Sequence, residues 1–183
     1  IDLVQNFSQA FVPSLGEQIE TDILALQSSA VTNPTIGDAD TGTPFGDDLI
    51  IPSGLTMDDL DVNLEERSWL LPPVAVAQLQ KNDKWVDADK TGLPKSVRST
   101  GFLNLDLYGV PAYRSTKIAT SGTIRKGMLL HREGLGVGIQ QNIKMEKFAR
   151  TQFSTPFASS VLYGVGVIRN NHIQVVNIKR TLV

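Results

Sequence analysis

Adjacent carboxylates are the side chains in this sequence with the clearest potential for catalysis. Two such pairs, Asp58 with Asp59 and Glu65 with Glu66, lie close together in the sequence. An acid–base enzyme such as a glycosidase needs two carboxylates on opposite sides of a cleft. Neighbouring acids that follow a capping hydroxyl, here Thr56, are also typical of a helix start, where they interact favourably with the helix dipole. We therefore expect no enzymatic activity, and this cluster is the candidate active site if the chain is an enzyme.

The sequence has two histidines, His131 and His172, and no cysteine. The lack of cysteine excludes disulfides, thiolate metal ligands and cysteine nucleophiles. Two histidines disfavour a multi-histidine metal centre, and they leave little material for a hydrolytic triad, which usually needs a histidine base. We expect both histidines to be structural or surface residues, and we predict no metal site and no cofactor.

Three short segments have a superficial likeness to ligand-binding loops. Residues 38–42 (DADTG) and 87–92 (DADKTG) begin like calcium loops, but neither supplies the bidentate glutamate of a complete site. In residues 134–138 (GLGVG) glycine alternates with apolar residues, without the strand, G-x-G-x-x-G and helix of a nucleotide-binding loop. We interpret the first two segments as turns and the third as a strand packed closely against another backbone.

Basic residues recur at a spacing of three in the segment NIKMEKFAR, where they are Lys144, Lys147 and Arg150. In a helix this spacing would place them on one face, with Ile143 and Phe148 turned towards a core. A basic helical face suits contact with phosphate groups. A solvated face, or a salt-bridged contact between subunits, fits the same pattern equally well.

The composition of the chain is that of an ordinary folded protein. It has 183 residues, of which 41% are hydrophobic and 20% charged, enough for one domain or two small lobes. No apolar run approaches the roughly 20 residues that cross a bilayer, and the N-terminus lacks the features of a signal peptide. We therefore expect no association with a membrane.

The net charge of -2 conceals an uneven distribution along the chain. Residues 1–92 contain 16 acidic and 4 basic residues, a charge of -12, and residues 93–183 contain 3 acidic and 13 basic residues, a charge of +10. Such polarity can serve contact with nucleic acid or complementary faces on neighbouring copies. Alternatively, the two sets of charges intermingle in the folded chain and are solvated.

The hydrophobic pattern predicts an α+β fold whose second half is rich in strands. We expect a helix at 17–26, a buried strand at 67–71, a helix from Pro73 to Lys81 and a strand at 103–107. No alternation of strands and helices suggests a doubly wound sheet.

The remaining segments carry turn signals or weaker patterns. Residues 1–16, with Pro13 and Gly16, predict an extended arm, and residues 32–54 predict a loop with a short strand at 49–51. A short helix is expected to begin at Thr56. Two apolar runs, 161–168 and 172–178, are joined by a short polar turn and predict a β-hairpin.

Four segments resemble, in order, the major capsid proteins of tailed phages, which have the HK97-like fold. They are LEERSWLLPP with VAVAQL after it (64–79), LYGVPAYRST (107–116), MLLHREGLGVGIQ (128–140), and LYGVGVIR with VVNIK (162–169 and 175–179). No single segment is specific, but their order and spacing extend over residues 64–179. The long spine helix and the long E-loop hairpin of the family find no counterpart in the sequence. Either the chain is a compact variant of the family, or segments of a longer protein are absent from the sequence, and we expect the second.

The resemblance implies an axial domain at 68–130, located at capsomer centres. It implies a peripheral domain at 17–62 and 135–183, which keeps a remnant of the E-loop region, and an N-terminal arm at 1–16. The implied function is self-assembly into an icosahedral head around double-stranded DNA, without catalysis.

The expected partners are other copies of the chain in hexamers and pentamers, together with cement, scaffold and portal proteins. Packaged DNA would be bound without sequence specificity, and the basic residues at 144, 147 and 150 are the candidates for contacts with DNA or another subunit. The expected location is the virion, after assembly in the host cytoplasm. The alternatives are an encapsulin-like compartment shell and a β-rich cement or accessory binding module.

Overall fold

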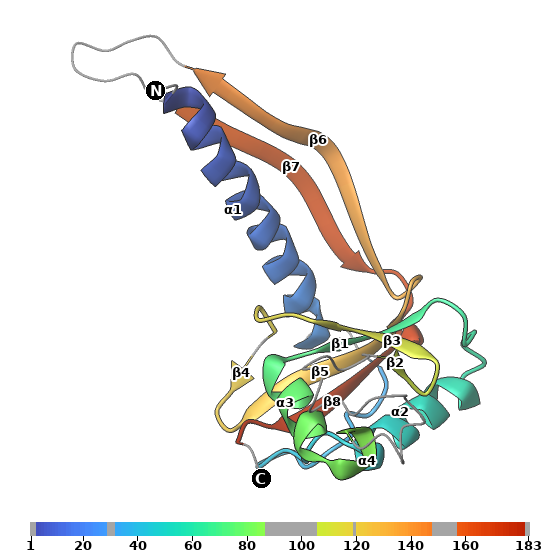
Figure 1. Cartoon of the computed structure of the whole chain (residues 1–183). Helices are drawn as coiled ribbons and strands as arrows, with labels where there is room; N and C mark the ends of the chain where they lie inside the picture. The colour runs from blue at the N-terminus through green and yellow to red at the C-terminus, as the bar shows by residue number, and fades with distance from the viewer. Residues whose placement is uncertain (1–2, 29–31, 87–105, 119, 148–156, 182–183) are drawn as a thin grey trace.

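The computed structural model describes residues 3–28, 32–86, 106–118, 120–147 and 157–181 (Figure 1). It has an α+β fold in which a helix-covered mixed sheet carries a long helix and a long β-hairpin. In Figure 1 the helix and the hairpin extend side by side from the same face of the sheet, and the C-terminus lies at the sheet.

The sheet is organised around the strand β5 (Ile124–His131). Along one edge β5 pairs antiparallel with β1 (Arg67–Leu71) and with the two-residue strand β4 (Thr120–Ser121). Along its other edge β5 pairs antiparallel with β8 (Ile173–Lys179). Strand β5 thus has partners along both edges and links β1 and β4 to β8.

The sheet continues outward from β1 through a parallel pairing with β3 (Val110–Arg114). Strand β3 pairs antiparallel with β2 (Asp106–Leu107), and Tyr108 and Gly109 connect the two. These connecting residues have φ angles of 53° and 80°. Positive φ at both central positions is the requirement of a type I′ turn, which matches the twist of the two strands.

The main core lies between one face of the sheet and the helices α2 (Asp47–Asp59) and α3 (Pro73–Lys81), with α4 (Asp83–Val86) after α3. Trp69 is 1% exposed, and its ring meets the ring of Phe45 edge-on at 5.6 Å. The core residues are Phe45, Leu49, Ile50, Met57, Val62, Trp69, Leu71, Ala75, Leu79, Leu107, Val110, Ala112, Leu129, Val176 and Ile178.

The opposite face of the sheet contacts the C-terminal end of α1 (Leu3–Ala25), which continues into the 3₁₀ turn η1 (Leu26–Ser28). Leu24 is buried there with Ile118 and Met128. Alternate residues of β1 serve the two faces, as the period of two in a strand dictates. The sheet is therefore covered on both sides, and α1 is held by its C-terminal end.

The long hairpin consists of β6 (Leu135–Lys147) and β7 (Phe157–Val167). The strands pair antiparallel, and register shifts between Ile139 and Lys144 bend the ladder. Its described side chains are exposed or half-buried, so the hairpin is an arm of the molecule and not part of the main core.

The outer edge of β8 is covered by the chain that precedes α2. Ile36 and Thr43 form bridges to Val176 and Ile178, with backbone hydrogen bonds of 2.8 to 3.1 Å. Covering this edge removes a row of unpaired backbone groups that would otherwise pair with another strand.

The prediction of an extended arm at 1–16 is wrong, because α1 is a continuous helix of 23 residues that includes Pro13 and Gly16. The helix expected at 17–26 is the C-terminal part of this longer element. The sequence showed no sign of a long helix, and the structure has one in α1. Among the described residues, no helix is both long and apolar enough to cross a membrane.

The predicted strand at 49–51 and the predicted helix start at Thr56 are also wrong. A single helix, α2, runs from Asp47 to Asp59 and contains Pro52. Its buried residues Leu49, Ile50 and Met57 anchor it to the core, and this packing outweighs the backbone hydrogen bond lost at the proline. Asp58 and Asp59 consequently lie at the end of the helix and not at its start.

The strands predicted at 161–168 and 172–178 are present, but they do not form a hairpin with each other. Strand β7 pairs with β6, and the 3₁₀ turn η2 (Asn170–His172) leads β8 back to β5. Residues 173–179 therefore share a sheet with 124–131, across the predicted boundary between axial and peripheral domains. The assignment of these names to positions in a shell stays a prediction.

Other expectations are confirmed. The strand at 67–71 is β1, the helix from Pro73 to Lys81 is α3, and the second half of the chain is rich in strands. Of the strand predicted at 103–107, residues 106 and 107 form β2, and the others lie outside the described residues.

Candidate functional site

A shallow apolar groove of about 320 Å³ lies beside α2 on the surface of the sheet. Four of its side chains are large, apolar and more than half exposed: Ile51, Leu55, Leu64 and Tyr108. Its floor is formed by buried residues, which include Trp69 and Leu129. Exposed apolar side chains that are gathered around one groove are characteristic of a contact surface for another macromolecule.

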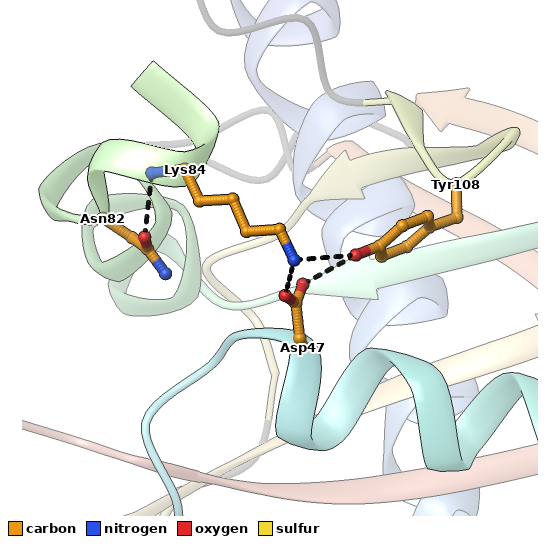
Figure 2. A network of polar contacts seen from close by, with 4 residues as sticks. All are labelled: Asp47, Asn82, Lys84 and Tyr108. Carbon is orange, nitrogen blue, oxygen red and sulfur yellow. Dashed lines mark hydrogen bonds and ion pairs between the residues drawn. The ribbon is translucent and has the colours of Figure 1, made fainter. Parts of the chain in front are cut away.

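A polar network fixes one side of this groove (Figure 2). The hydroxyl of Tyr108 donates a hydrogen bond of 2.9 Å to Asp47 at the start of α2. The ammonium group of Lys84 binds the other carboxylate oxygen of Asp47, and the Asn82 side chain accepts the Lys84 backbone N–H at 3.0 Å. These bonds raise the pKa of Lys84, mainly through Asp47 and secondly through Tyr108. The network thereby connects α2, α4 and the β2–β3 turn.

Arg67 forms the polar part of the groove floor. Its side chain is 2% exposed and its guanidinium lies 2.7 Å from the Asp58 carboxylate. The same group donates hydrogen bonds to the carbonyls of Asn63, at 3.0 Å, and Val62. A buried guanidinium with three partners holds the chain that connects α2 to β1 in a fixed position.

The four carboxylates proposed as the only possible active site do not converge in the structure. Asp58 pairs with Arg67, and Glu66 pairs with Arg132 at 3.0 Å. All four side chains are exposed, and of the four only Asp58 lines the groove. The geometry thus gives Asp58 and Glu66 arginine partners, and it does not bring the four carboxylates together as a pair across a cleft.

His131 and His172 are brought together by the junction between the sheet and the hairpin. Both are buried, and their rings meet edge-on with centroids 5.3 Å apart. Burial lowers the pKa of His172, and the nearby Arg169 and His131 act in the same direction. Their burial excludes the surface alternative of the sequence prediction, the structural role stays a prediction, and their proximity was not predicted.

Residues 38–42 form a turn, as predicted. One carboxylate oxygen of Asp38 accepts the backbone N–H groups of Asp40, at 2.8 Å, and Thr41, at 2.9 Å. These bonds, that from Thr41 first, lower the pKa of Asp38. Gly42 has a φ of 69°, and a Cβ at this position would meet the backbone of β8, so the turn requires glycine here. The second calcium-like segment, 87–92, lies outside the described residues.

Gly136 and Gly138 lie in the first residues of β6, as the interpretation of a strand required, and Gly134 directly precedes it. A Cβ at Gly134 would lie 2.8 Å from Ile173, and a Cβ at Gly136 would lie 2.6 Å from Ile168. Gly138 has open space instead. Close approach to backbone is found at Gly134 alone, where a Cβ would also lie 3.1 Å from the carbonyl oxygens of His131 and His172; the close neighbour of Gly136 is a side chain, and Gly138 has none.

The predicted basic helical face does not exist. Lys144 and Lys147 belong to the strand β6, in which a spacing of three does not place side chains on one face. Lys144 is exposed on the hairpin, and Arg150 lies outside the described residues. A role for these residues in DNA or subunit contact stays a prediction.

The acidic and basic parts of the chain interact within the folded molecule. Glu17 of α1 pairs with Lys117 at 2.7 Å, and Glu66 pairs with Arg132. Part of the charge asymmetry is consequently satisfied internally, as the second of the two sequence interpretations proposed.

No protein family matches this sequence, and no curated protein matches it. Solved structures do match its fold. A structure from Mycobacterium phage Che8 has a TM-score of 0.74 and 18% identity, over 93% of this chain. The capsid structure of cyanophage P-SCSP1u has a TM-score of 0.74 and 16% identity, over 99% of this chain. The holo-SrpI encapsulin complex from Synechococcus elongatus has a TM-score of 0.67 and 17% identity, over 98% of this chain.

These matches confirm the predicted HK97-like capsid fold. The chain spans 61% of the length of the Che8 protein, and 67% of the length of the cyanophage and encapsulin proteins. The likeness includes nearly the whole of this chain, and the N-terminal third, which carried none of the resembling segments, belongs to the same fold.

Proposed function

We propose that this chain is a shell subunit, the major capsid protein of a tailed phage, which assembles into an icosahedral head around double-stranded DNA. The observation that carries the proposal is the likeness to the cyanophage capsid structure over 99% of the chain. Because one fold can host several functions, the surfaces of the chain have to support assembly as well.

The apolar groove beside α2 supplies such a surface, and a second copy of the chain is its proposed occupant. Ile51 and Leu55 on α2 and Leu64 in the connection from α2 to β1 are 55%, 58% and 59% exposed, and such a group of exposed apolar side chains around one groove is characteristic of an interaction surface. The polar network around Tyr108 fixes the rim before the partner arrives, which lowers the entropy cost of association.

Further partners follow from the same proposal. Hexamers and pentamers of the chain would form the shell, and cement, scaffold and portal proteins would bind to it. The exposed Lys144 on β6 is a candidate for contact with packaged DNA or with a neighbouring subunit. The mature location would be the virion capsid, after assembly in the host cytoplasm.

We also propose that the chain has no catalytic activity. The support is the position of the acids: Asp58 and Glu66 are occupied by arginine partners and do not face each other across a cleft.

An encapsulin-like compartment shell is the second candidate function, because an encapsulin complex matches the fold over 98% of this chain. Both candidates predict closed particles, and they differ in the contents. A phage head would package DNA with the help of its portal, whereas a compartment would enclose protein cargo.

The test is expression of the full-length protein, with and without a scaffold, followed by sedimentation and negative-stain microscopy. Closed particles are the expected result, and analysis of their nucleic acid and protein contents separates the two candidates. A monodisperse monomer or trimer at high concentration, with the scaffold present, would overturn the proposal and favour a β-rich cement or accessory module.

A further inference from the structure

Three side chains that can bind a metal ion meet where the sheet is joined to the long hairpin. His131 ends β5, Glu133 lies in the turn before β6, and His172 lies in η2 directly before β8. One potential ligand atom from each residue lies within 4.8 Å of the other two. The three residues come from two connections that are far apart in the sequence, so the fold itself assembles the cluster.

The ring of His172 is oriented as a ligand. Its Nδ1 lies 2.9 Å from the side-chain oxygen of Asn171. An amide oxygen can only accept a hydrogen bond, so Nδ1 carries the ring proton and the lone pair is on Nε2. Metal-binding histidines are held in this way, with the second ring nitrogen donating to an oxygen.

His131 has a buried ring nitrogen without a hydrogen-bond partner among the described residues. The residue is 5% exposed, and this nitrogen is Nε2. Its Nδ1 receives the backbone N–H of Glu133 at 3.3 Å, a long and weak contact. Binding of an ion at Nε2 would move the ring proton to Nδ1 and exchange this weak contact for a metal bond.

Glu133 adds a carboxylate that is available at low cost. It pairs with Arg169 at 3.2 Å, and both side chains are about half exposed. Such surface ion pairs contribute little to stability, so the carboxylate can turn from the guanidinium to an ion. The positive charge of Arg169 disfavours the binding of a cation nearby, so removal of this charge is expected to strengthen metal binding.

We propose that His131, Glu133 and His172 form a binding site for a divalent transition-metal ion of borderline softness, represented by Zn²⁺. Two imidazoles and one carboxylate are a common zinc ligand set, with water in the fourth position. Bond lengths of 2.0 to 2.2 Å place tetrahedral ligand atoms about 3.3 Å apart, so the cluster would contract by at most about 1.5 Å. Calcium and magnesium prefer sets made of oxygen, which this site does not offer.

The ion would fasten the junction between the sheet and the hairpin. Gly134 donates a hydrogen bond of 2.8 Å to the carbonyl of His131 and accepts one of 3.0 Å from Ile168, so β6 and β7 both leave the sheet at this point. A metal bridge between the ends of β5 and η2 would limit their relative movement. The site depends on these residues alone and would exist whether or not the chain forms a shell.

The experiment is a Zn²⁺ titration of the untagged, chelator-treated chain in competition with a chromophoric chelator, with Co²⁺ as a spectroscopic probe. We expect one ion per chain and the visible absorption of a low-symmetry Co²⁺ site. Glu133→Gln should weaken binding by about tenfold or more, and Arg169→Ala should strengthen it. Glu146→Gln, at an exposed acid on β6, is the matched control and should leave binding unchanged.

The exposed position of Glu133 keeps the test decisive, since its substitution does not disturb the core. His172→Asn is the second variant, and circular dichroism shows whether it folds. Zinc affinity that is equal in the wild type, Glu133→Gln and folded His172→Asn would overturn the proposal. Failure of the wild type to compete for Zn²⁺ would overturn it as well, irrespective of the outcome of the particle assay.

Discussion

The hydroxyl of Tyr163 on β7 donates a hydrogen bond to the carboxylate of Asp22 on α1. This bond joins the two long elements that extend from the sheet. On the same helix, Glu20 accepts a hydrogen bond from Ser115, and Glu17 pairs with Lys117. The C-terminal half of α1 is therefore attached through three acidic residues, one of which meets β7 and two of which meet the segment after β3.

Tyr163→Phe should loosen the attachment of α1 to the hairpin. Loss of one partly buried hydrogen bond to a carboxylate should lower the free energy of unfolding by about 1 kcal/mol. Urea denaturation measures the change, and Tyr113→Phe, at a tyrosine that is 60% exposed, is the control. Equal effects of the two substitutions would contradict the prediction.

The same contact should make stability depend on alkaline pH. The hydrogen bond to Asp22 first, then burial and the negative charge, raise the pKa of Tyr163 above 10.0. The folded state thus holds this proton more tightly than the unfolded state. The stabilisation that the Tyr163 proton gives to the folded state is fully present below pH 10.0, and it is lost as the pH rises through the pKa of Tyr163 in the folded state. Ultraviolet titration should reveal a late-ionising phenol that is absent from Tyr163→Phe.

Arg67→Met should destabilise the chain by about 2 kcal/mol, because the carbonyls of Val62 and Asn63 would lose their donor. Arg67→Lys should rescue only part of this loss, since one ammonium group cannot reproduce the planar fork of donors. Denaturant unfolding of both variants is the measurement. Full rescue by lysine would show that charge alone matters at this position.

Leu55→Asp should block particle formation without lowering the stability of the isolated chain. Leu55 is 58% exposed, so the new charge is solvated in the monomer and becomes unfavourable only when a second copy covers the groove. Asp59→Ala changes an exposed residue of the same helix outside the groove and serves as the control. Sedimentation gives the assembled fraction, and normal particles from Leu55→Asp would remove the groove from the proposed interface.

Particles should become less cohesive as the salt concentration rises, if the charges of -12 and +10 in the two parts of the chain act between subunits. Ion pairs such as Glu17–Lys117 already satisfy part of this asymmetry within the chain, so we expect a moderate effect. Light scattering across a salt series measures it. An absence of salt dependence would show that these charges do not hold neighbouring subunits together.

The sequence predicted best those elements whose signals are local. Pro73 marks the start of α3, and the residues of β1 alternate between two buried faces, so both elements could be recognised from composition and period. Helix α1 was missed because Pro13 and Gly16 are strong turn signals. Only its C-terminal part was predicted, because Ile19, Ile23 and Leu26 there recur at the spacing of one helical face.

Partners distant in sequence could not be predicted in the same way. The runs before and after Arg169 have the pattern of a hairpin, yet β8 is buried along six of its seven residues whereas the described part of β7 is exposed or half-buried. This difference follows from β8 entering the sheet beside β5. The pairing of His131 with His172 depends on that long-range arrangement, and two isolated histidines carry no signal of it.

The hairpin that leaves the sheet at Gly134 acts mechanically as a lever arm. Strand β6 has 13 residues and spans about 43 Å, so a rotation of about 10° at its base would displace its tip by about 7 Å. The bonds around Gly134, together with the attachment of β7 to α1 through Tyr163 and Asp22, thus determine the position of the far end of the arm. In a closed shell built from one chain, this leverage would convert small local adjustments into the different curvatures that hexamers and pentamers need.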